Sequence, residues 1–200
     1  MNLNPREVRR STAVLLAVVS LAASLAAQSP SIGVSQVRID NFGKISDSYY
    51  RGAQPLEDDY ADLAALGVHT VIDLTADGRR DESGLVEHAG MKFYRIPMTT
   101  TDRPSESAVA AFLQLVRDPV NQPVYVHCQG GRHRTGAMTA VYRMTIDGWT
   151  ADRAYSEMKQ FNFEGFPGHP ALKQFVYDYY DQIGRTRIAE RPAAATVASR

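Results

Sequence analysis

The sequence predicts an α/β fold in three layers, with a parallel-rich central sheet flanked by helices. Short β-branched segments alternate along the chain with segments of helical periodicity, which is typical of a mostly parallel sheet covered on both faces. Two of these segments, 69–74 and 123–127, contain few polar residues, as expected of central strands. No internal repeat or second domain is found in the 200 residues, so we expect a single domain.

The first half of the chain begins with two predicted strands, at 37–42 (VRIDNF) and 48–54 (SYYRGAQ), separated by the turn-like sequence GKISD. A helix is predicted over 55–67, because Pro55 opens it, acidic residues occupy its first turn and Gly67 closes it. Its buried stripe would consist of Leu56, Tyr60, Leu63 and Leu66. A strand at 69–74, a weaker helix at 78–90 and a strand at 91–98 follow.

The second half is predicted to be mostly helical. A strong helix is expected over 104–118, where Asp118-Pro119 ends it. One face of this helix carries Val109, Phe112, Leu113 and Val116. The next strand is 123–127, and three further helices are predicted, at 135–148, 150–161 and 170–184.

The N-terminal segment is predicted to be separate from this domain. Three arginines within residues 1–10 precede the uncharged, Ala-rich run Ser11–Ala27, in the order of a secretory signal peptide. We therefore expect residues 1–27 to be a signal peptide and the protein to be exported, to the periplasm or outside the cell. The alternative is an uncleaved membrane anchor formed by residues 11–27, which is at the short limit for a span. The rest of the chain divides into a linker, the domain and a flexible tail, at 28–36, 37–184 and 185–200.

Charge and cysteine content narrow the classes of function. Basic and acidic residues number 22 each, so no overall field favours nucleic acid and we expect no nucleic-acid partner. A membrane partner is expected only if the N-terminal segment stays uncleaved. Cys128 is the single cysteine and cannot form an intramolecular disulfide, so it is either a buried filler or a reactive thiol.

The surroundings of Cys128 favour the reactive thiol. It lies between the strand 123–127 and a helix predicted from Thr135, in a loop where Gly130 and Gly131 let backbone N–H groups turn inward at low steric cost. Together with the positive end of the helix, these N–H groups form an anion site suited to phosphate or sulfate. Arg134 follows six residues after Cys128 and can bind the same anion bidentately.

A thiol in such a site predicts a specific chemistry. The positive field favours the thiolate, and the Thr135 hydroxyl can donate a hydrogen bond to the sulfur. A thiolate beneath a bound phosphate is placed for in-line attack on phosphorus, so the residues imply a cysteinyl-phosphate intermediate without a metal or other cofactor. Asp102, on an irregular segment between a strand and a helix, can protonate the leaving oxygen and then activate water. Two alternatives remain open: Asp102 as a helix cap, and Asp73 as the acid.

The segment 127–136, HCQGGRHRTG, resembles the Cys-x5-Arg-Ser/Thr signature of cysteine-dependent protein phosphatases. It is most similar to the compact dual-specificity group and its bacterial relatives, over residues 49–180. YRGAQPLEDDYADLAALGVHTVIDL is similar to the group's opening strand, helix and central strand, and TTTDRP to its general-acid loop. The Trp-Pro-Asp form of that loop and the long tyrosine-recognition segment of the large tyrosine-specific enzymes are absent.

The resemblance implies a dual-specificity phosphatase-like fold, with 37–184 as the phosphatase domain, and a role for each matching residue. Cys128 would be the nucleophile, Arg134 the phosphate clamp and Asp102 the general acid. His127 would orient the loop, and Thr135 would assist hydrolysis of the phosphoenzyme. The expected phosphate-binding residues are Gln129, Gly130, Gly131, Arg132, His133 and Arg134.

Substrate and class remain open within this prediction. The first expectation is a protein-tyrosine or dual-specificity phosphatase that acts on a phosphorylated protein. Arg132 and His133, as two basic side chains on the rim, would favour an inositol phosphate or phosphoinositide, unless they merely face solvent. The other readings are a catalytically dead phosphate-binding module, a structural cysteine and a rhodanese-type sulfurtransferase, whose usual loop is one residue shorter before its Arg.

No metal site is expected. His69, His88 and His169 are scattered along the sequence and are interpreted as surface or loop residues, and no clustered carboxylates accompany them.

Overall fold

The computed structural model describes residues 33–163 and 168–189, and its centre is a five-stranded sheet in the order β1-β2-β5-β3-β4. β1 runs antiparallel to β2, and all other neighbouring strands are parallel, so the predicted α/β fold with a parallel-rich sheet is confirmed. The strands are β1 (Gly43–Ser46), β2 (Tyr49–Gly52), β3 (Thr70–Thr75), β4 (Lys92–Met98) and β5 (Val124–His127). The helices are α1 (Asp59–Ala65), α2 (Glu82–His88), α3 (Glu106–Arg117), α4 (His133–Thr145), α5 (Ala151–Gln160) and α6 (Pro170–Ala189), with 3-10 turns at Val34–Gln36 and Pro119–Asn121.

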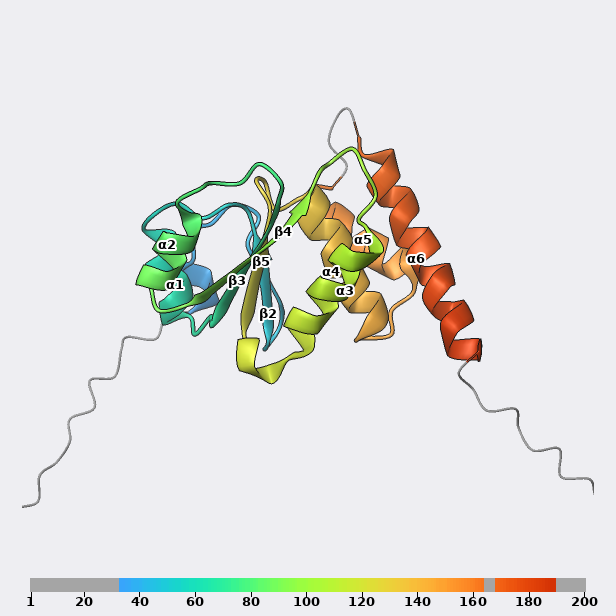
Figure 1. The fold of residues 1–200 in the computed structure, drawn as a ribbon, viewed down its shortest axis with the longest axis horizontal. Coiled ribbons are helices and arrows are strands. Elements are labelled where there is room, and N and C mark those ends of the chain that lie inside the picture. The colour runs from blue at the N-terminus through green and yellow to red at the C-terminus, as the bar shows by residue number, and fades with distance from the viewer. Residues whose placement is uncertain (1–32, 164–167, 190–200) are drawn as a thin grey trace, which may run out of the picture.

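Helices cover both faces of the sheet. Figure 1 shows α1 and α2 on one face and the four helices α3 to α6 on the other. Side chains of a strand alternate between its two faces, so Val124 and Val126 of β5 enter the larger core beneath α3 to α6, while Tyr125 enters the smaller core beneath α1 and α2. α4 lies at the centre of the larger core, and nearly all of its residues are buried.

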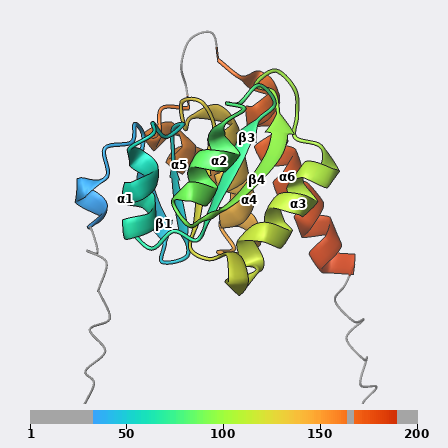
Figure 2. The same ribbon diagram turned by 60° about the vertical axis from the view of Figure 1, so that its left-hand side comes forward.

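The carboxyl ends of the parallel strands meet at one edge of the sheet. In β5, His127 lies opposite Gly52 of β2 and Asp73 of β3. The segments that leave these strands therefore gather at the same edge, which is the upper edge in Figures 1 and 2. In a parallel α/β sheet this is the edge where ligands bind.

The first hairpin differs from the sequence prediction. Residues 37–42 are not a strand, because Asn41 adopts a positive φ of 56° and the Phe42 N–H donates to the Ile39 carbonyl in a turn. The segment GKIS, interpreted as a turn, is instead β1 and pairs with β2. β1 has only four residues, of which one is buried, so its sequence cannot show the alternation of buried and exposed side chains that identifies a strand.

Helix boundaries also shift. α1 begins at Asp59 rather than Pro55, since Leu56 lies in a turn that is closed by the Asp59 carboxylate, which accepts from the Leu56 N–H at 2.8 Å. Leu56 is therefore 71% exposed and not part of the buried stripe. α4 begins two residues before the expected Thr135, and α6 continues beyond Gly184 into the segment expected to be a flexible tail.

The predicted signal peptide or anchor and residues 190–200 of the predicted tail lie outside the described residues. Within the described part, every helix is too short or too polar to cross a membrane.

Candidate active site

Cys128 follows β5 directly and lies at the edge where the parallel strands end. Alternation along the strand points His127 toward α2 and Cys128 toward α4 and the larger core, where its side chain is buried. The loop continues to Arg132, and α4 begins at His133. The predicted strand, loop and helix order around the thiol is therefore present.

Three groups from the β1–β2 side of the sheet bind the carbonyls of this loop. The Gln54 N–H donates to the Gln129 carbonyl at 3.1 Å. The Gly131 carbonyl accepts from Arg51 Nη2 at 2.5 Å and from Asn41 Nδ2 at 2.8 Å. The loop carbonyls are thus fixed toward β2.

Fixing the carbonyls also fixes the N–H groups. The carbonyl and the N–H of a trans peptide point in opposite directions, so the N–H groups of Gly130 and Arg132 point away from β2, toward the interior of the loop. The N-cap residue of α4, Arg132, makes no side-chain capping bond to the first turn. Loop and helix end therefore together present backbone donors, the arrangement that binds an oxyanion.

Gly131 permits the tight turn of the loop. Its φ is +63°, which favours glycine, and a Cβ there would collide with the backbone of Gly52 and Ala53. The loop consequently packs against β2 more closely than any side chain would allow.

Arg134 and Thr135 lie in the first turn of α4, both buried. Arg134 Nη1 donates to the Met98 carbonyl at 3.2 Å and lies 3.5 Å from the carboxylate of Asp77. Arg134 Nε and Thr135 Oγ1 have no hydrogen-bond partner among the described residues. Buried polar atoms are normally satisfied, so these two atoms are suited to bind a polar group that enters the site, such as an anion.

Asp102 lies on the exposed segment between β4 and α3. Its Oδ2 accepts from Thr99 Oγ1 at 2.7 Å and from Thr101 Oγ1 at 3.3 Å. The cap of α3 is Ser105, whose hydroxyl accepts from the Ala108 N–H. Asp102 is therefore not a helix cap, and its carboxylate stays accessible to solvent.

Asp73, the alternative acid, has other partners. It is fully buried, and its carboxylate accepts from Arg95 Nε at 2.7 Å and from the Thr75 N–H at 2.8 Å. These bonds hold it as the partner of Arg95 and of the backbone at the end of β3.

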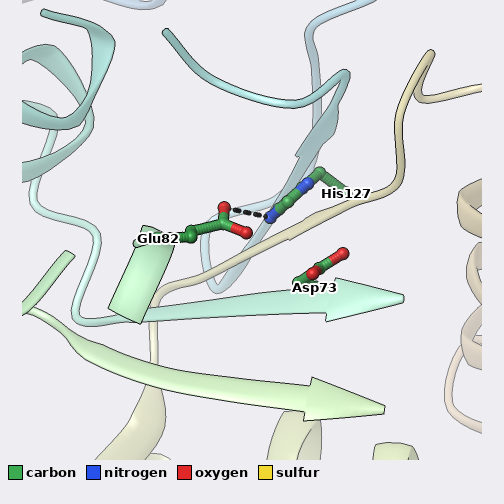
Figure 3. A group of neighbouring side chains, drawn as sticks. All are labelled: Asp73, Glu82 and His127. Carbon is green, nitrogen blue, oxygen red and sulfur yellow. Dashed lines mark ion pairs between the residues drawn. The ribbon is translucent and has the colours of Figure 1, made fainter. Parts of the chain in front are cut away.

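His127 contacts a buried carboxylate on α2, as Figure 3 shows. Its Nε2 lies 2.9 Å from Glu82 Oε1, with the ring N–H outside the usual hydrogen-bond angle. Glu82 also accepts from Gln54 Nε2 at 2.7 Å and from the Tyr60 hydroxyl at 2.9 Å. Burial would raise the pKa of Glu82, but these partners, His127 first, lower it below its usual value.

Three buried side chains form a cluster of titratable groups that was not anticipated from the sequence. They are Asp73, Glu82 and His127. One ligand-type atom from each lies within 4.8 Å of the others, a spacing that could hold a metal ion. Arg95, however, contacts both carboxylates, at 2.7 Å and 3.5 Å. The guanidinium supplies the positive charge that a metal would, so the cluster is an ion-pair network. It is joined to the loop through His127, which precedes Cys128, and through Gln54, which binds both Glu82 and the Gln129 carbonyl.

The two predicted rim residues differ from one another. Arg132 is exposed, in keeping with a rim position. The ring of His133 is partly buried, with its centroid 3.6 Å from that of His169 and 5.6 Å from that of Phe163. Burial, and next the charge of His169, lower the pKa of His133 to about 4. His133 is therefore neutral near pH 7, and its interpretation as a basic rim residue is wrong.

Several residues that build the site were missed in the sequence. Arg51, Asn41 and Gln54 bind the loop from the first hairpin, and His169 contacts the ring of His133 from the start of α6. The available signal was Arg51 in the predicted strand SYYRGAQ. A buried arginine needs a hydrogen-bond acceptor or an anion, so its presence in a strand indicates a partner elsewhere in the fold.

Comparisons with known proteins agree with this geometry. A family model described as "DSP-PTPase phosphatase fused to NAD+ Kinase" matches residues 35–173. The inositol diphosphatase SIW14 of Saccharomyces cerevisiae is 26% identical over 158 residues, 76% of this chain. The dual specificity protein phosphatase TpbA of Pseudomonas aeruginosa is 31% identical over 124 residues, 62% of this chain. The match spans 55% of the length of each of these relatives.

The fold is also similar to that of a solved structure. The crystal structure of a Cys-to-Ser variant of P. aeruginosa TpbA in complex with pTyr superimposes with a TM-score of 0.64 at 24% identity. It covers 80% of this chain and 94% of that chain. At this identity the likeness shows the fold.

Proposed function

The chain belongs to the family of DSP-PTPase phosphatases, and we propose that it hydrolyses phosphate monoesters through a phosphocysteine intermediate, without a metal. The single observation that carries the proposal is the position of Cys128: at the carboxyl end of β5, beneath a loop whose carbonyls are held toward β2. The adjacent Arg134 Nε and Thr135 Oγ1 are buried without a partner among the described residues.

The first step transfers the phosphoryl group to sulfur. The Cys128 thiolate attacks phosphorus in line with the leaving oxygen, so that the P–S bond forms as the P–O bond breaks. Asp102, protonated at the start, gives its proton to that oxygen. The N–H groups of the loop and the Arg134 fork neutralise the charge on the equatorial phosphoryl oxygens.

The second step releases phosphate. The carboxylate of Asp102 takes a proton from water, and the water oxygen attacks phosphorus as the P–S bond breaks. Thr135 Oγ1, in the first turn of α4, donates to the departing sulfur and so stabilises it as the thiolate. His127, held by Glu82, keeps the end of β5 in place.

A phosphorylated protein is the proposed substrate. Asp102 lies on an exposed segment and Arg134 contacts the exposed Asp77, so the acid and the loop open to the surface, where a side chain of another protein can enter. TpbA, which is named a dual specificity protein phosphatase, supports this choice.

An inositol phosphate is the second candidate. Arg132 is exposed on the loop and could bind an additional phosphate, and SIW14, named an inositol diphosphatase, supports this reading. Only one of the two expected basic side chains remains, because His133 is neutral. Substitution of Arg132 by Ala should then weaken multiply phosphorylated substrates, whereas equal effects on all substrates would leave it as a solvent-facing residue.

Export is a further part of the proposal. The basic and then apolar order of residues 1–27 supports a signal peptide, and retention of 11–27 would instead anchor the enzyme to a membrane. The N-terminal sequence of the protein recovered from cells, with its fractionation, tests this. Cleavage after Ala26 or Ala27 and recovery outside the cytoplasm would support export.

The testing experiment is phosphate release by the purified full-length chain, with chelator and reductant present. Four substrates are compared: a phosphotyrosine peptide, a phosphoserine peptide, a phosphoinositide and inositol hexakisphosphate. Cys128→Ser is the control, which should abolish release and still bind vanadate. Release that persists in this variant would rule out the covalent mechanism. Vanadate binding without any release by the wild-type chain would favour a phosphate-binding module.

A further inference from the structure

The segment that carries Asp102 is attached to the rest of the site at two backbone carbonyls. At its start, the Met98 carbonyl accepts from Arg134 Nη1 at 3.2 Å. Two residues on, the Thr100 carbonyl lies 3.1 Å from His169 Nδ1. A carbonyl oxygen only accepts, so Nδ1 of His169 carries the hydrogen of this bond. Between these points, Thr99 binds the carboxylate of Asp102.

His169 also contacts the first residue of α4, which directly follows the loop. Its ring lies 3.6 Å, centroid to centroid, from that of His133, with the planes tilted by 45°. His133 is the first residue of α4 and the direct neighbour of Arg134. Both rings pack against Phe163 in a T-shaped arrangement, so His169 is both packed against aromatic rings and hydrogen-bonded to the acid segment.

We propose that His169 is a positioning residue that sets Asp102 relative to the phosphate held by the loop. The proposal rests on the proposed function, since it assigns the acid role to Asp102. The chain of contacts is short: Asp102 to Thr99, the Thr100 carbonyl to His169, and His169 to His133 on the first turn of α4. None of these contacts needs the carboxylate itself to touch the histidine.

A second contact joins the segment that carries Asp102 to α6, and it lies at the surface. Arg103 and Asp178 form an ion pair at 2.6 Å, but both side chains are well exposed. Exposed pairs contribute little, and this one joins the residue after Asp102 to α6. Of the contacts made by the Arg103–Asp178 pair and by His169, the partly buried His169 contact is thus the one that fixes the acid segment more firmly.

The effect of losing it depends on the leaving group. A poor leaving group such as the serine alkoxide needs a proton from Asp102, whereas p-nitrophenolate needs little help. His169→Ala should therefore lower kcat on a phosphoserine peptide by roughly 10- to 100-fold. On p-nitrophenyl phosphate the same variant should lose no more than about 3-fold, because thiolate, loop and Arg134 stay in place.

Two variants control for structural damage. His169→Asn keeps an N–H donor at the position of Nδ1 and should recover most of the activity on the phosphoserine peptide. His88→Ala removes an exposed histidine at the end of α2, remote from the site, and should leave both substrates unaffected. Thermal unfolding of each variant verifies that the chain is folded.

A double substitution gives the sharpest comparison. With Asp102→Asn already present, His169→Ala should have no further effect on the phosphoserine peptide, because both changes act on the same proton transfer. Equal losses on the two substrates, or additive losses in the double variant, would overturn the positioning role. If the wild-type chain shows no Cys128-dependent release from either substrate, the proposed function fails instead.

Discussion

Arg51 Nη2 donates to the Gly131 carbonyl at 2.5 Å, joining the first hairpin to a loop that follows 80 residues later. The guanidinium is fully buried, lies 4.1 Å from the ring centroid of Phe161, and has Nε and Nη1 without a hydrogen-bond partner among the described residues. Burial lowers the pKa of Arg51, and the charges of Tyr49, Glu157 and Cys128 act in the opposite direction. A buried cation of this kind costs stability unless an anion compensates it.

Replacing Arg51 should consequently lower the activity without lowering the stability of the fold. Arg51→Met removes the buried charge with little change in volume, so the Tm should be unchanged or higher. The same variant leaves the Gly131 carbonyl without this donor, and kcat should fall by roughly 10- to 100-fold. Arg51→Lys should recover part of kcat. Thermal unfolding and phosphate release measured on the same samples provide the check, and a lower Tm accompanied by a matching loss of folded protein would contradict the argument.

The sequence predicted the centre of the fold better than its edge. β3 and β5 are buried on both faces and appear in the sequence as short segments with few polar residues, so their positions were identified to within one residue. β1 lies at the edge of the sheet and has a single buried residue, Ile45. Its pattern contains no signal that distinguishes a strand from a turn.

The site was predictable where it is contiguous in the chain. Cys128 and Arg134 lie within one loop and one helix turn, where spacing alone relates them. Arg51, Asn41 and His169 reach the loop only because the sheet order places β2 beside β5 and because α6 begins next to α4. Such contacts depend on tertiary structure, which no local pattern encodes.

Gly131→Ala should disable the loop, whereas Gly130→Ala should be much milder. A Cβ on Gly131 would meet the backbone of Gly52, which cannot move aside, and the positive φ adds strain. On Gly130 a Cβ would meet only side-chain atoms of Arg132, at 3.7 Å and beyond. Vanadate affinity should fall by about 10-fold or more in the first variant alone. Similar losses in the two variants would show that packing against Gly52 is not what sets the loop.

Arg134→Lys should lower both kcat and vanadate affinity, because an ammonium offers a point charge where the guanidinium offers a fork. Arg134 also donates to the Met98 carbonyl, and a lysine cannot make that bond and bind the anion with the same geometry. We expect a loss of roughly 100-fold in kcat. Arg117→Lys, at the exposed end of α3, is the matched control and should have no effect. A variant at position 134 that keeps more than half of the activity would remove Arg134 from the clamp role.

His133 should make the protein less stable in mild acid. Its folded-state pKa is lowered to about 4, first by burial and then by the charges of His169, Arg132 and Arg134, while a hydrogen bond to the Phe163 backbone opposes them. In the unfolded chain a histidine titrates near pH 6.5. Between about pH 6.5 and pH 4 the unfolded state thus binds the extra proton, so the free energy of unfolding falls as the pH falls through this window. Urea unfolding from pH 7 to pH 4 should show a shallower decline for His133→Asn than for the wild type, with His88→Ala following the wild type. Parallel curves for all three proteins would mean that His133 is protonated equally in the folded and unfolded states.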